Sequence, residues 1–172
     1  ITGVEPVVLV EPLKALRKMG AGLRIFGAAG PKARIRMVME RRPAGITIDT
    51  GPYPGFPTDL QSVFLAAEAS GTGESQIRET VYEARFEAAV RLASFGADVS
   101  VHGDTAIIKG RYPLLPGVVE TPDLRGGAAL LVAALSADGL SVVSDRGHLK
   151  RGYEDIGRDL RILGADIEEN IL

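Results

Sequence analysis

The sequence predicts an α+β fold made of repeated βαβαββ units, and two patterns that recur along the chain are the basis of that prediction. The first pattern is the end of an amphipathic helix, then Gly-Ala, then an alternating strand, and it occurs at 13–25, 89–101 and 159–171. The second is a helix rich in alanine and leucine followed by an extended run, and it occurs at 58–77 and 122–143. Interleaved, the two patterns give each unit the order strand, helix, strand, helix, strand, strand, and the helices pack against neighbouring units.

The spacing of the first pattern indicates a repeating unit of roughly 65–75 residues. The 172 residues are therefore interpreted as a single domain, with a partial unit at 1–43 and complete units at about 44–110 and 111–172. In each copy a left-handed glycine is predicted to end the helix, namely Gly20, Gly96 and Gly164. The truncated first unit, in a chain that begins at Ile1 without a methionine, indicates a fragment of a longer protein.

The first helix is predicted at 9–19, with one apolar face formed by Leu9, Leu13, Leu16 and Met19. The next helix follows a stiff, proline-rich arm at 50–57. Thr58 and Gln61 have the spacing of a capping box, which places Asp59 in the first turn of that helix. One interpretation of Asp59 is simply a partner for the helix dipole, an interaction worth about 0.3–1 kcal/mol.

Thr80 and Glu83 have the spacing of a second capping box and predict a helix that contains Arg85. Its predicted buried residues are Phe86, Ala89, Val90 and Ala93. Arg85 is as well placed to pair with Glu83 or Glu87 as to contact a ligand.

Thr121 followed by Pro122 predicts an N-cap with proline at the first helical position. Gly126-Gly127 follow in that helix, where they allow a ligand or a backbone segment to approach closely. The last helix is predicted from about Tyr153 to Leu163. Its predicted inward residues are Ile156, Leu160 and Leu163.

Composition excludes several classes of function. The net charge is −2 with no long basic run, which gives non-specific nucleic-acid binding little support. Cysteine is absent, which excludes disulfides and thiolate metal sites and fits a reducing compartment. His102 and His148 are the only histidines, so a zinc site would need several carboxylates and no metal is expected. No apolar run reaches the roughly 18 residues of a membrane span, and no glycine-rich phosphate loop is present.

Two cationic positions at helix starts indicate an anion site. Arg125 stands in the first turn of its helix, where its positive charge is unfavourable next to the positive end of the helix dipole. Either Asp123 offsets this charge, or the guanidinium and the helix amides bind an anion. Lys150-Arg151 precede the last helix and have the same two interpretations, an anion site or solvated surface charges. Because helix starts gather at one end of such a fold, Asp59, Arg125 and Arg151 are expected to line a single mouth.

Four motifs occur in the order and spacing of a known family: GPYPGFPTDLQ at 51–61, ETVYEARF at 79–86, TPDLRGGAALLVA at 121–133 and RGYEDIGRDLRILGADIE at 151–168. In these motifs, and across essentially the whole chain from about Val4, the sequence resembles the enolpyruvyl transferase family. The resemblance implies two domains joined by a hinge, each with three βαβαββ units around a pseudo-threefold axis, an inside-out α/β barrel. This chain matches the C-terminal part of such a protein.

The activity that the resemblance implies is transfer of enolpyruvyl from phosphoenolpyruvate to the 3′-hydroxyl of UDP-N-acetylglucosamine, by addition and elimination with release of phosphate. That reaction belongs to peptidoglycan precursor synthesis in the bacterial cytoplasm, and the resemblance implies no cofactor. A second alternative is the 3-phosphoshikimate 1-carboxyvinyltransferase branch. The segment RGYED at 151–155 departs from the lysine-glutamate-serine-aspartate-arginine type of signature of that branch.

The motifs also imply residue roles. Asp59 would contact the sugar hydroxyl and is the candidate general base. Val81 would contact the uridine nucleotide. Arg125 and Arg151 would hold the carboxylate and phosphate of phosphoenolpyruvate, and Arg85 would support the site less directly.

The chain departs from the family because the N-terminal domain, with the mobile loop that carries the proton donor, is missing. It therefore holds half an active site and is expected to be inactive alone, with the missing domain as its partner and neither nucleic acid nor membrane. The alternative is a non-catalytic relative or excised scaffold unit that binds at most an anionic ligand. The positions of Asp59, Arg125 and Arg151 argue against a repeat module used only for protein contacts.

Overall fold

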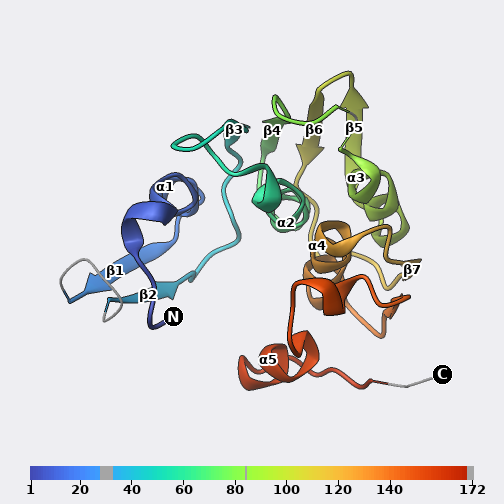
Figure 1. Ribbon diagram of the computed structural model, residues 1–172. Helices are drawn as coiled ribbons and strands as arrows, with labels where there is room; N and C mark the ends of the chain where they lie inside the picture. The colour runs from blue at the N-terminus through green and yellow to red at the C-terminus, as the bar shows by residue number, and fades with distance from the viewer. Residues whose placement is uncertain (28–32, 84, 170–172) are drawn as a thin grey trace.

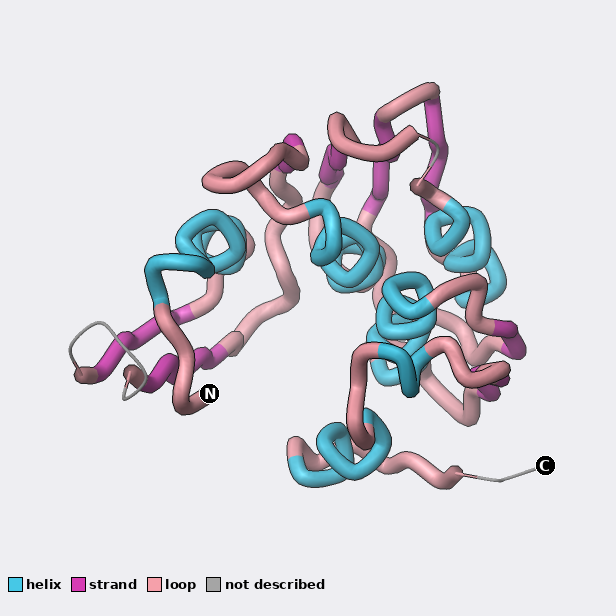
Figure 2. Tube along the Cα trace, in the orientation of Figure 1, coloured by secondary structure: helices cyan, strands magenta, loops and turns pink. Residues whose placement is uncertain are grey.

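The computed structural model of the chain describes residues 1–27, 33–83 and 85–169. The helices are α1 (Val10–Lys18), α2 (Thr58–Ala69), α3 (Glu87–Leu92), α4 (Leu124–Leu135) and α5 (Ile156–Ile162), with short 3-10 helices η1 (Pro6–Leu9), η2 (Ala93–Phe95) and η3 (Leu149–Arg151). The strands are β1 (Gly22–Phe26), β2 (Arg34–Val38), β3 (Thr47–Asp49), β4 (Glu74–Arg78), β5 (Asp98–His102), β6 (Thr105–Lys109), β7 (Val118–Glu120) and β8 (Val142–Ser144). They follow one another around an arch, from the β1–β2 hairpin at one end to α5 at the other (Figures 1 and 2).

The element order agrees with the predicted α+β repeat. Residues 44–110 contain β3, α2, β4, α3, β5 and β6, which is the full βαβαββ order, and the chain before them contains α1, β1 and β2. After residue 110 the order is β7, α4, β8 and α5. The assignment of these stretches to separate units stays a prediction.

The strand predicted after the last helix does not form at 165–169, which have no regular structure, and the rest of that prediction lies outside the described residues. A strand is stable only when its backbone groups pair with a neighbour. No described strand pairs with this segment, and Arg161 instead donates a hydrogen bond to the Ile167 carbonyl at 3.3 Å.

The three glycines predicted to end helices are left-handed, with φ of 105° at Gly20, 69° at Gly96 and 97° at Gly164. A residue with a Cβ atom adopts this backbone conformation only at a steric cost. The glycine therefore ends each helix at the predicted position and turns the chain into the segment that follows.

Strands form three separate sheets. The largest has the order β3-β4-β6-β5, in which β3 and β4 are parallel and the other pairs are antiparallel. β1 and β2 form an antiparallel hairpin, and β7 and β8 form a second parallel pair. The buried residues of β4 and β6 alternate, so that one sheet face is covered by α2 and α3 while the other is exposed.

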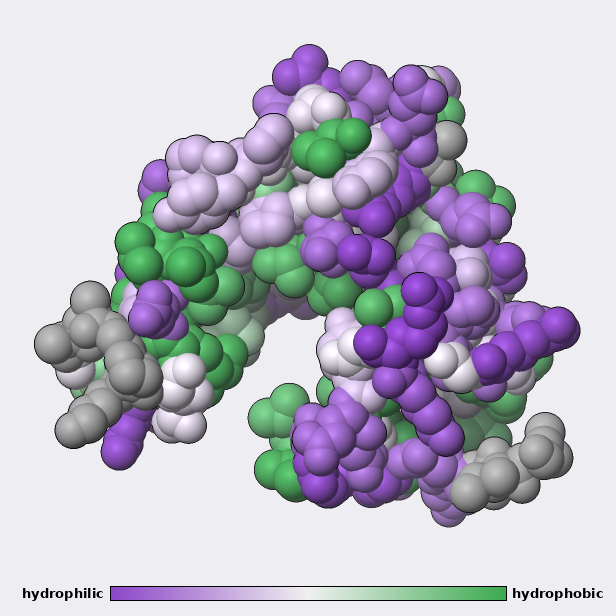
Figure 3. All heavy atoms as spheres, viewed as in Figure 1, coloured by the Kyte–Doolittle hydropathy of each residue, from purple (hydrophilic) through white to green (hydrophobic). Residues whose placement is uncertain are grey.

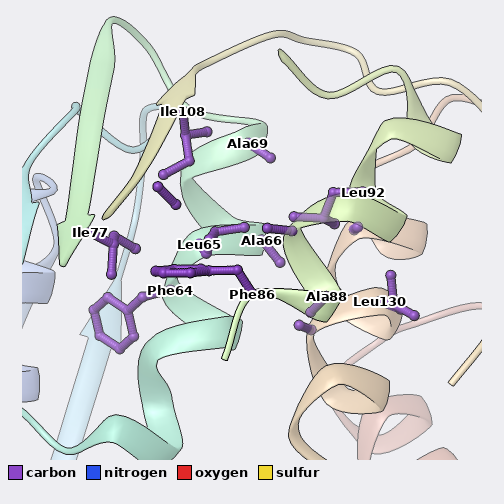
Figure 4. Packing of buried hydrophobic residues seen from close by; sticks show 14 of the residues in the cluster. Phe64, Leu65, Ala66, Ala69, Ile77, Phe86, Ala88, Leu92, Ile108 and Leu130 are labelled. Atoms are coloured by element: carbon purple, nitrogen blue, oxygen red, sulfur yellow. The ribbon is translucent and has the colours of Figure 1, made fainter. Parts of the chain in front are cut away.

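The core lies between the sheet and the helices α2, α3 and α4. Figure 4 shows Phe64, Leu65 and Ala66 of α2 among side chains from β4, β6, α3 and α4. Leu65 and Ala66 are fully buried, and the ring of Phe64 packs edge-on against Phe56 at 5.0 Å between centroids. Small residues let α2 and α4 approach closely, so the two helices form the centre of the fold.

The glycine pair in α4 serves packing. A Cβ atom at Gly126 would stand 2.6 Å from Pro122, and one at Gly127 would stand 3.0 Å from the side chain of Leu149. Of the two partners that the sequence allowed, a ligand or another part of the chain, the structure shows the chain.

Both predicted capping boxes are wrong. Thr58 is the first residue of α2 instead of its cap, and its hydroxyl donates to Glu79 at 2.7 Å. The helix predicted from Thr80 begins only at Glu87, because the amide and hydroxyl of Thr80 both bond to Thr50, at 2.8 and 2.5 Å. Arg85 consequently lies in the loop before α3.

The late start of α3 also changes its buried face. Phe86 and Ala89 are buried as predicted, but Val90 is 69% exposed and Ala93 is exposed as well. Since the helix is only a turn and a half long, the residues that face the core are Ala88, Ala89 and Leu92.

The starts of α4 and α5 are shifted toward aspartates. Asp123, not Thr121, caps α4 and accepts from the amides of Arg125 and Gly126 at 2.8 and 2.9 Å. Asp155 caps α5 by accepting from Arg158 at 2.8 Å, so this helix begins after Tyr153. Its residues Ile156 and Leu160 are half-buried, whereas Leu163 is 81% exposed and the prediction of an inward Leu163 is wrong.

Three of the four residues predicted on the apolar face of the first helix face the core, since Leu13 and Met19 are buried and Leu16 packs against it. The fourth, Leu9, is half-buried and belongs to η1, before α1 begins. The space-filling view shows the arch hollowed between the part that contains α1 and the part that contains α5 (Figure 3). Over the described residues, no helix combines the length and the apolar character that crossing a membrane would require.

Candidate active site

An aspartate and two arginines from distant parts of the chain meet at the helix starts. The Arg125 Nε atom donates to Asp59 Oδ1 at 2.5 Å, and the Arg85 Nη1 atom lies 3.6 Å from the same oxygen. Asp59 stands in the first turn of α2 and Arg125 in the first turn of α4. The packing of α2 against α4 therefore brings the predicted base and a predicted anion-binding residue into direct contact.

This ion pair shifts the pKa values of both partners. The hydrogen bond from Arg125, with the charges of Arg125 and Arg85, holds the pKa of Asp59 below its usual value, while the bond to Asp59 raises the pKa of Arg125. The side chain of Asp59 is 60% exposed, so water screens the pair and it contributes little to stability. At neutral pH Asp59 is ionised and accessible.

Arg85 is held from a second side. Its Nη1 atom donates to the Thr58 hydroxyl at 2.8 Å, and its guanidinium lies 4.3 Å from the ring centroid of Tyr82. Thr58 directly precedes Asp59 in α2, so Thr58 orients the same arginine, Arg85, that faces Asp59.

A buried carboxylate, Glu79, lies behind this cluster. Its Oε2 accepts from Thr58, and its Oε1 accepts from the Thr50 hydroxyl and from the amides of Val81 and Tyr82, at 2.7 to 3.2 Å. Burial alone would raise the pKa of Glu79, but these hydrogen bonds together hold it below its usual value. Glu79 thus keeps its charge inside the protein and fixes the loop that carries Val81, whose side chain is 37% exposed.

Arg151 lies apart from the cluster. It ends η3, and η3 packs on the first turns of α4: a Cβ atom at Gly152 would stand 2.7 Å from Leu124, the residue before Arg125. Within the described part of the chain, the Arg151 side chain forms no ion pair. Arg151 therefore lies near the start of α4 and is exposed, but it does not contact Asp59.

Sequence reasoning missed the role of four residues of this region. Thr50 and Thr121 directly follow β3 and β7, and Glu79 and Asp145 directly follow β4 and β8. Each threonine hydroxyl donates to the acid of its own strand pair, at 2.7 and 2.6 Å. The signal is present in the sequence, as a threonine after each first strand and an acid after each second strand, but it is recognisable only once the strands are paired.

Nothing in the described residues suggests a metal site, since they contain no group of three histidine, aspartate or glutamate side chains placed to hold an ion. The site gathers a carboxylate, the guanidinium groups of Arg85 and Arg125, and helix-start amides, with Arg151 nearby. Such groups suit a polar substrate that carries anionic groups and a hydroxyl to be deprotonated.

The fold is that of the enolpyruvyl transferases. It superposes with a TM-score of 0.79 and 29% identity on the enolpyruvyl transferase NikO from Streptomyces tendae, covering 93% of this chain and 36% of that one. An EPSP synthase from Acinetobacter baumannii shares the fold at a TM-score of 0.66 and 19% identity, over 94% of this chain and 37% of that one.

The sequence comparisons agree. The family described as EPSP synthase (3-phosphoshikimate 1-carboxyvinyltransferase) matches residues 2–160, and the chain belongs to this enolpyruvyl transferase family. A UDP-N-acetylglucosamine 1-carboxyvinyltransferase from Symbiobacterium thermophilum is 39% identical over 98% of this chain, and one from Coprothermobacter proteolyticus is 42% identical over the same share. The chain spans only 38–39% of the length of these relatives.

Proposed function

We propose that the chain is the C-terminal part of an enzyme that transfers enolpyruvyl from phosphoenolpyruvate to the 3′-hydroxyl of UDP-N-acetylglucosamine, in peptidoglycan precursor synthesis. The observation that supports the proposal is the hydrogen bond between Arg125, the proposed ligand of an anion, and Asp59, the proposed base. The names of the relatives that match 98% of the chain support the choice of acceptor.

Asp59 is the proposed general base. Both arginine contacts involve its Oδ1 atom, so Oδ2 is the oxygen that can meet the sugar hydroxyl. The lowered pKa keeps it ionised, but it also makes Asp59 a weak base while Arg125 is bound to it. When the anionic groups of phosphoenolpyruvate take over Arg125, the pKa of Asp59 rises and the base strengthens only after that substrate is bound.

The remaining residues bind and orient. Arg125 and Arg151, at the start of α4 and beside it, hold the carboxylate and phosphate of phosphoenolpyruvate by charge-assisted hydrogen bonds. Val81 contacts the uridine nucleotide from the loop that Glu79 fixes. Arg85 supports Asp59 from the other side. The proton donor and the other half of the nucleotide site belong to the missing domain, so the isolated chain is proposed to be inactive.

The test is phosphate release from phosphoenolpyruvate by the full-length protein and by the 172-residue chain, with either UDP-N-acetylglucosamine or 3-phosphoshikimate as acceptor. The full-length protein should release phosphate with the nucleotide sugar only, and the chain alone should release none. Release with 3-phosphoshikimate would favour the other branch of the family. No release with either acceptor would favour a non-catalytic relative that at most binds an anion.

A further inference from the structure

The two parallel strand pairs end in the same way. Thr50 and Glu79 follow β3 and β4, and the threonine hydroxyl donates to the carboxylate at 2.7 Å. Thr121 and Asp145 follow β7 and β8, and the corresponding distance is 2.6 Å. Both threonines and Glu79 are at most 4% exposed. Each pair therefore ties the end of one strand to the end of its neighbour from inside the protein.

Each carboxylate also holds the loop that follows it. Glu79 accepts from the amides of Val81 and Tyr82 at 2.9 and 3.2 Å. Asp145 accepts from the amides of the three residues 147–149 at 3.0 to 3.2 Å. In both cases the hydrogen bonds outweigh the effect of burial, which would raise the pKa, and hold the pKa of the carboxyl group below its usual value. Each acid is thus charged in the folded protein and organises a loop backbone.

Both loops lead to an arginine of the candidate site, at the same distance along the chain. Arg85 stands six residues after Glu79, and Arg151 stands six residues after Asp145. Glu79 has a further link, because Thr58 donates to its Oε2 and accepts from Arg85 at 2.8 Å. Thr58 has one hydroxyl proton, and since that proton goes to Glu79, a lone pair is left facing the arginine.

A turn that stabilised only its own loop would need no partner on the neighbouring strand. Here the partner is present in both strand pairs, and the arginine follows at the same spacing. We propose that Glu79 and Asp145 are equivalent positioning residues, which act through their loops on two different parts of the substrate site. Glu79 positions the part formed by Val81 and Arg85, and Asp145 positions Arg151. This inference rests on the proposed function.

Replacing each carboxylate should therefore weaken the binding of a different substrate. In the full-length protein, Glu79→Gln should raise the KM for UDP-N-acetylglucosamine about tenfold or more and leave the KM for phosphoenolpyruvate within about twofold. Asp145→Asn should do the reverse, because the loop that Asp145 holds leads to Arg151, one of the two arginines assigned to phosphoenolpyruvate. A residue that served only folding would lower the melting temperature and change both KM values alike or neither.

Two exposed carboxylates provide matched controls, because each is the last residue of its strand and directly precedes a threonine. Asp49 pairs with Arg78 at 2.9 Å, and Glu120 pairs with Arg146 at 2.7 Å. Asp49→Asn and Glu120→Gln should leave both KM values within about twofold, since exposed pairs contribute little. If the controls behave like Glu79→Gln and Asp145→Asn, or if these two variants affect the same substrate, the inference is overturned.

Amide hydrogen exchange of the 172-residue chain tests the positioning without any turnover. Glu79→Ala should speed exchange at Val81 and Tyr82 about tenfold or more and spare residues 148–149, and Asp145→Ala should do the opposite. Thr50→Val and Thr121→Val keep the side-chain shape and repeat the test if the alanine variants do not fold. Unchanged exchange overturns the inference; changed exchange in a protein without transferase activity overturns the proposed function alone.

Discussion

Replacing Arg125 with methionine separates the two roles of its guanidinium, as partner of Asp59 and as ligand of phosphoenolpyruvate. The ion pair is short, 2.5 Å, but the side chains of Arg125 and Asp59 are 34% and 60% exposed. A pair screened to this extent contributes at most about 1 kcal/mol, and a cation in the first turn of α4 is itself slightly unfavourable. The variant should therefore lose less than about 1 kcal/mol of unfolding free energy.

Binding of phosphoenolpyruvate should suffer more. The loss of a charge-assisted hydrogen bond costs roughly 1.5–3 kcal/mol, which corresponds to an increase of about 10- to 100-fold in the KM. The KM for the nucleotide sugar should change much less, because Arg125 is not assigned to it. Arg125→Lys should recover little, since a lysine keeps the charge but loses the planar fork.

The assay is steady-state phosphate release by the full-length protein with each substrate varied in turn, together with the melting temperature. The reasoning would be refuted by an equal rise in both KM values. A large loss of stability with unchanged kinetics would also refute it, because Arg125 would then serve the fold.

Two further predictions concern stability. Burial raises the pKa of Glu68 from 4.5 to about 7. The stability that the protonated carboxyl group contributes is therefore complete below pH 4.5 and is lost, on the order of 3 kcal/mol, as the pH rises through 7. Melting temperatures measured between pH 5 and 8 should show this loss, and Glu68→Gln, whose amide oxygen can still accept from Ser75, should abolish it. Gly20 has a φ of 105° with open space around it, so Gly20→Ala should cost about 1–2 kcal/mol from backbone strain alone. Gly22→Ala is its matched control, because that position is not left-handed and a Cβ there makes only an ordinary contact with the Val38 carbonyl. Equal melting temperatures for the two variants would contradict the prediction that alanine is strained at position 20.

Periodic and conformational signals in the sequence predicted the fold well. The glycine at the end of each helix depends only on the backbone of its own turn, and Gly20, Gly96 and Gly164 all have the predicted left-handed conformation. Such signals are local, so they can be recognised without knowing what lies next to them in space.

Helix starts were predicted less well, because polar side chains there have partners from distant segments. A threonine three residues before a glutamate or glutamine has the spacing of a capping box whether or not its hydroxyl faces the helix. Thr58 and Thr121 bond instead to Glu79 and Asp145, which are 21 and 24 residues away in sequence. Their partners depend on how β3 pairs with β4 and β7 with β8, and no local pattern contains that information.

The candidate site was likewise predictable only where it depends on local sequence patterns. Its location at the helix starts followed from the repeat and from the motifs, but the direct contact between Asp59 and Arg125 did not, since it depends on the packing of α2 against α4. Glu79 was missed because a buried acid beside a strand has no spacing signature of its own. Its role is visible only in the four hydrogen bonds that its carboxylate accepts.

The central claim, that Asp59 is the base of an enolpyruvyl transferase, is tested most directly by Asp59→Asn in the full-length protein. Turnover should fall about 10²–10⁴-fold, while the loss of an exposed ion pair should lower the unfolding free energy by less than about 1 kcal/mol. Asp49→Asn, which removes an exposed carboxylate from another arginine pair, is the control and should keep normal turnover. Near-normal turnover of Asp59→Asn would contradict the claim and leave Asp59 as a partner of the helix dipole and of Arg125.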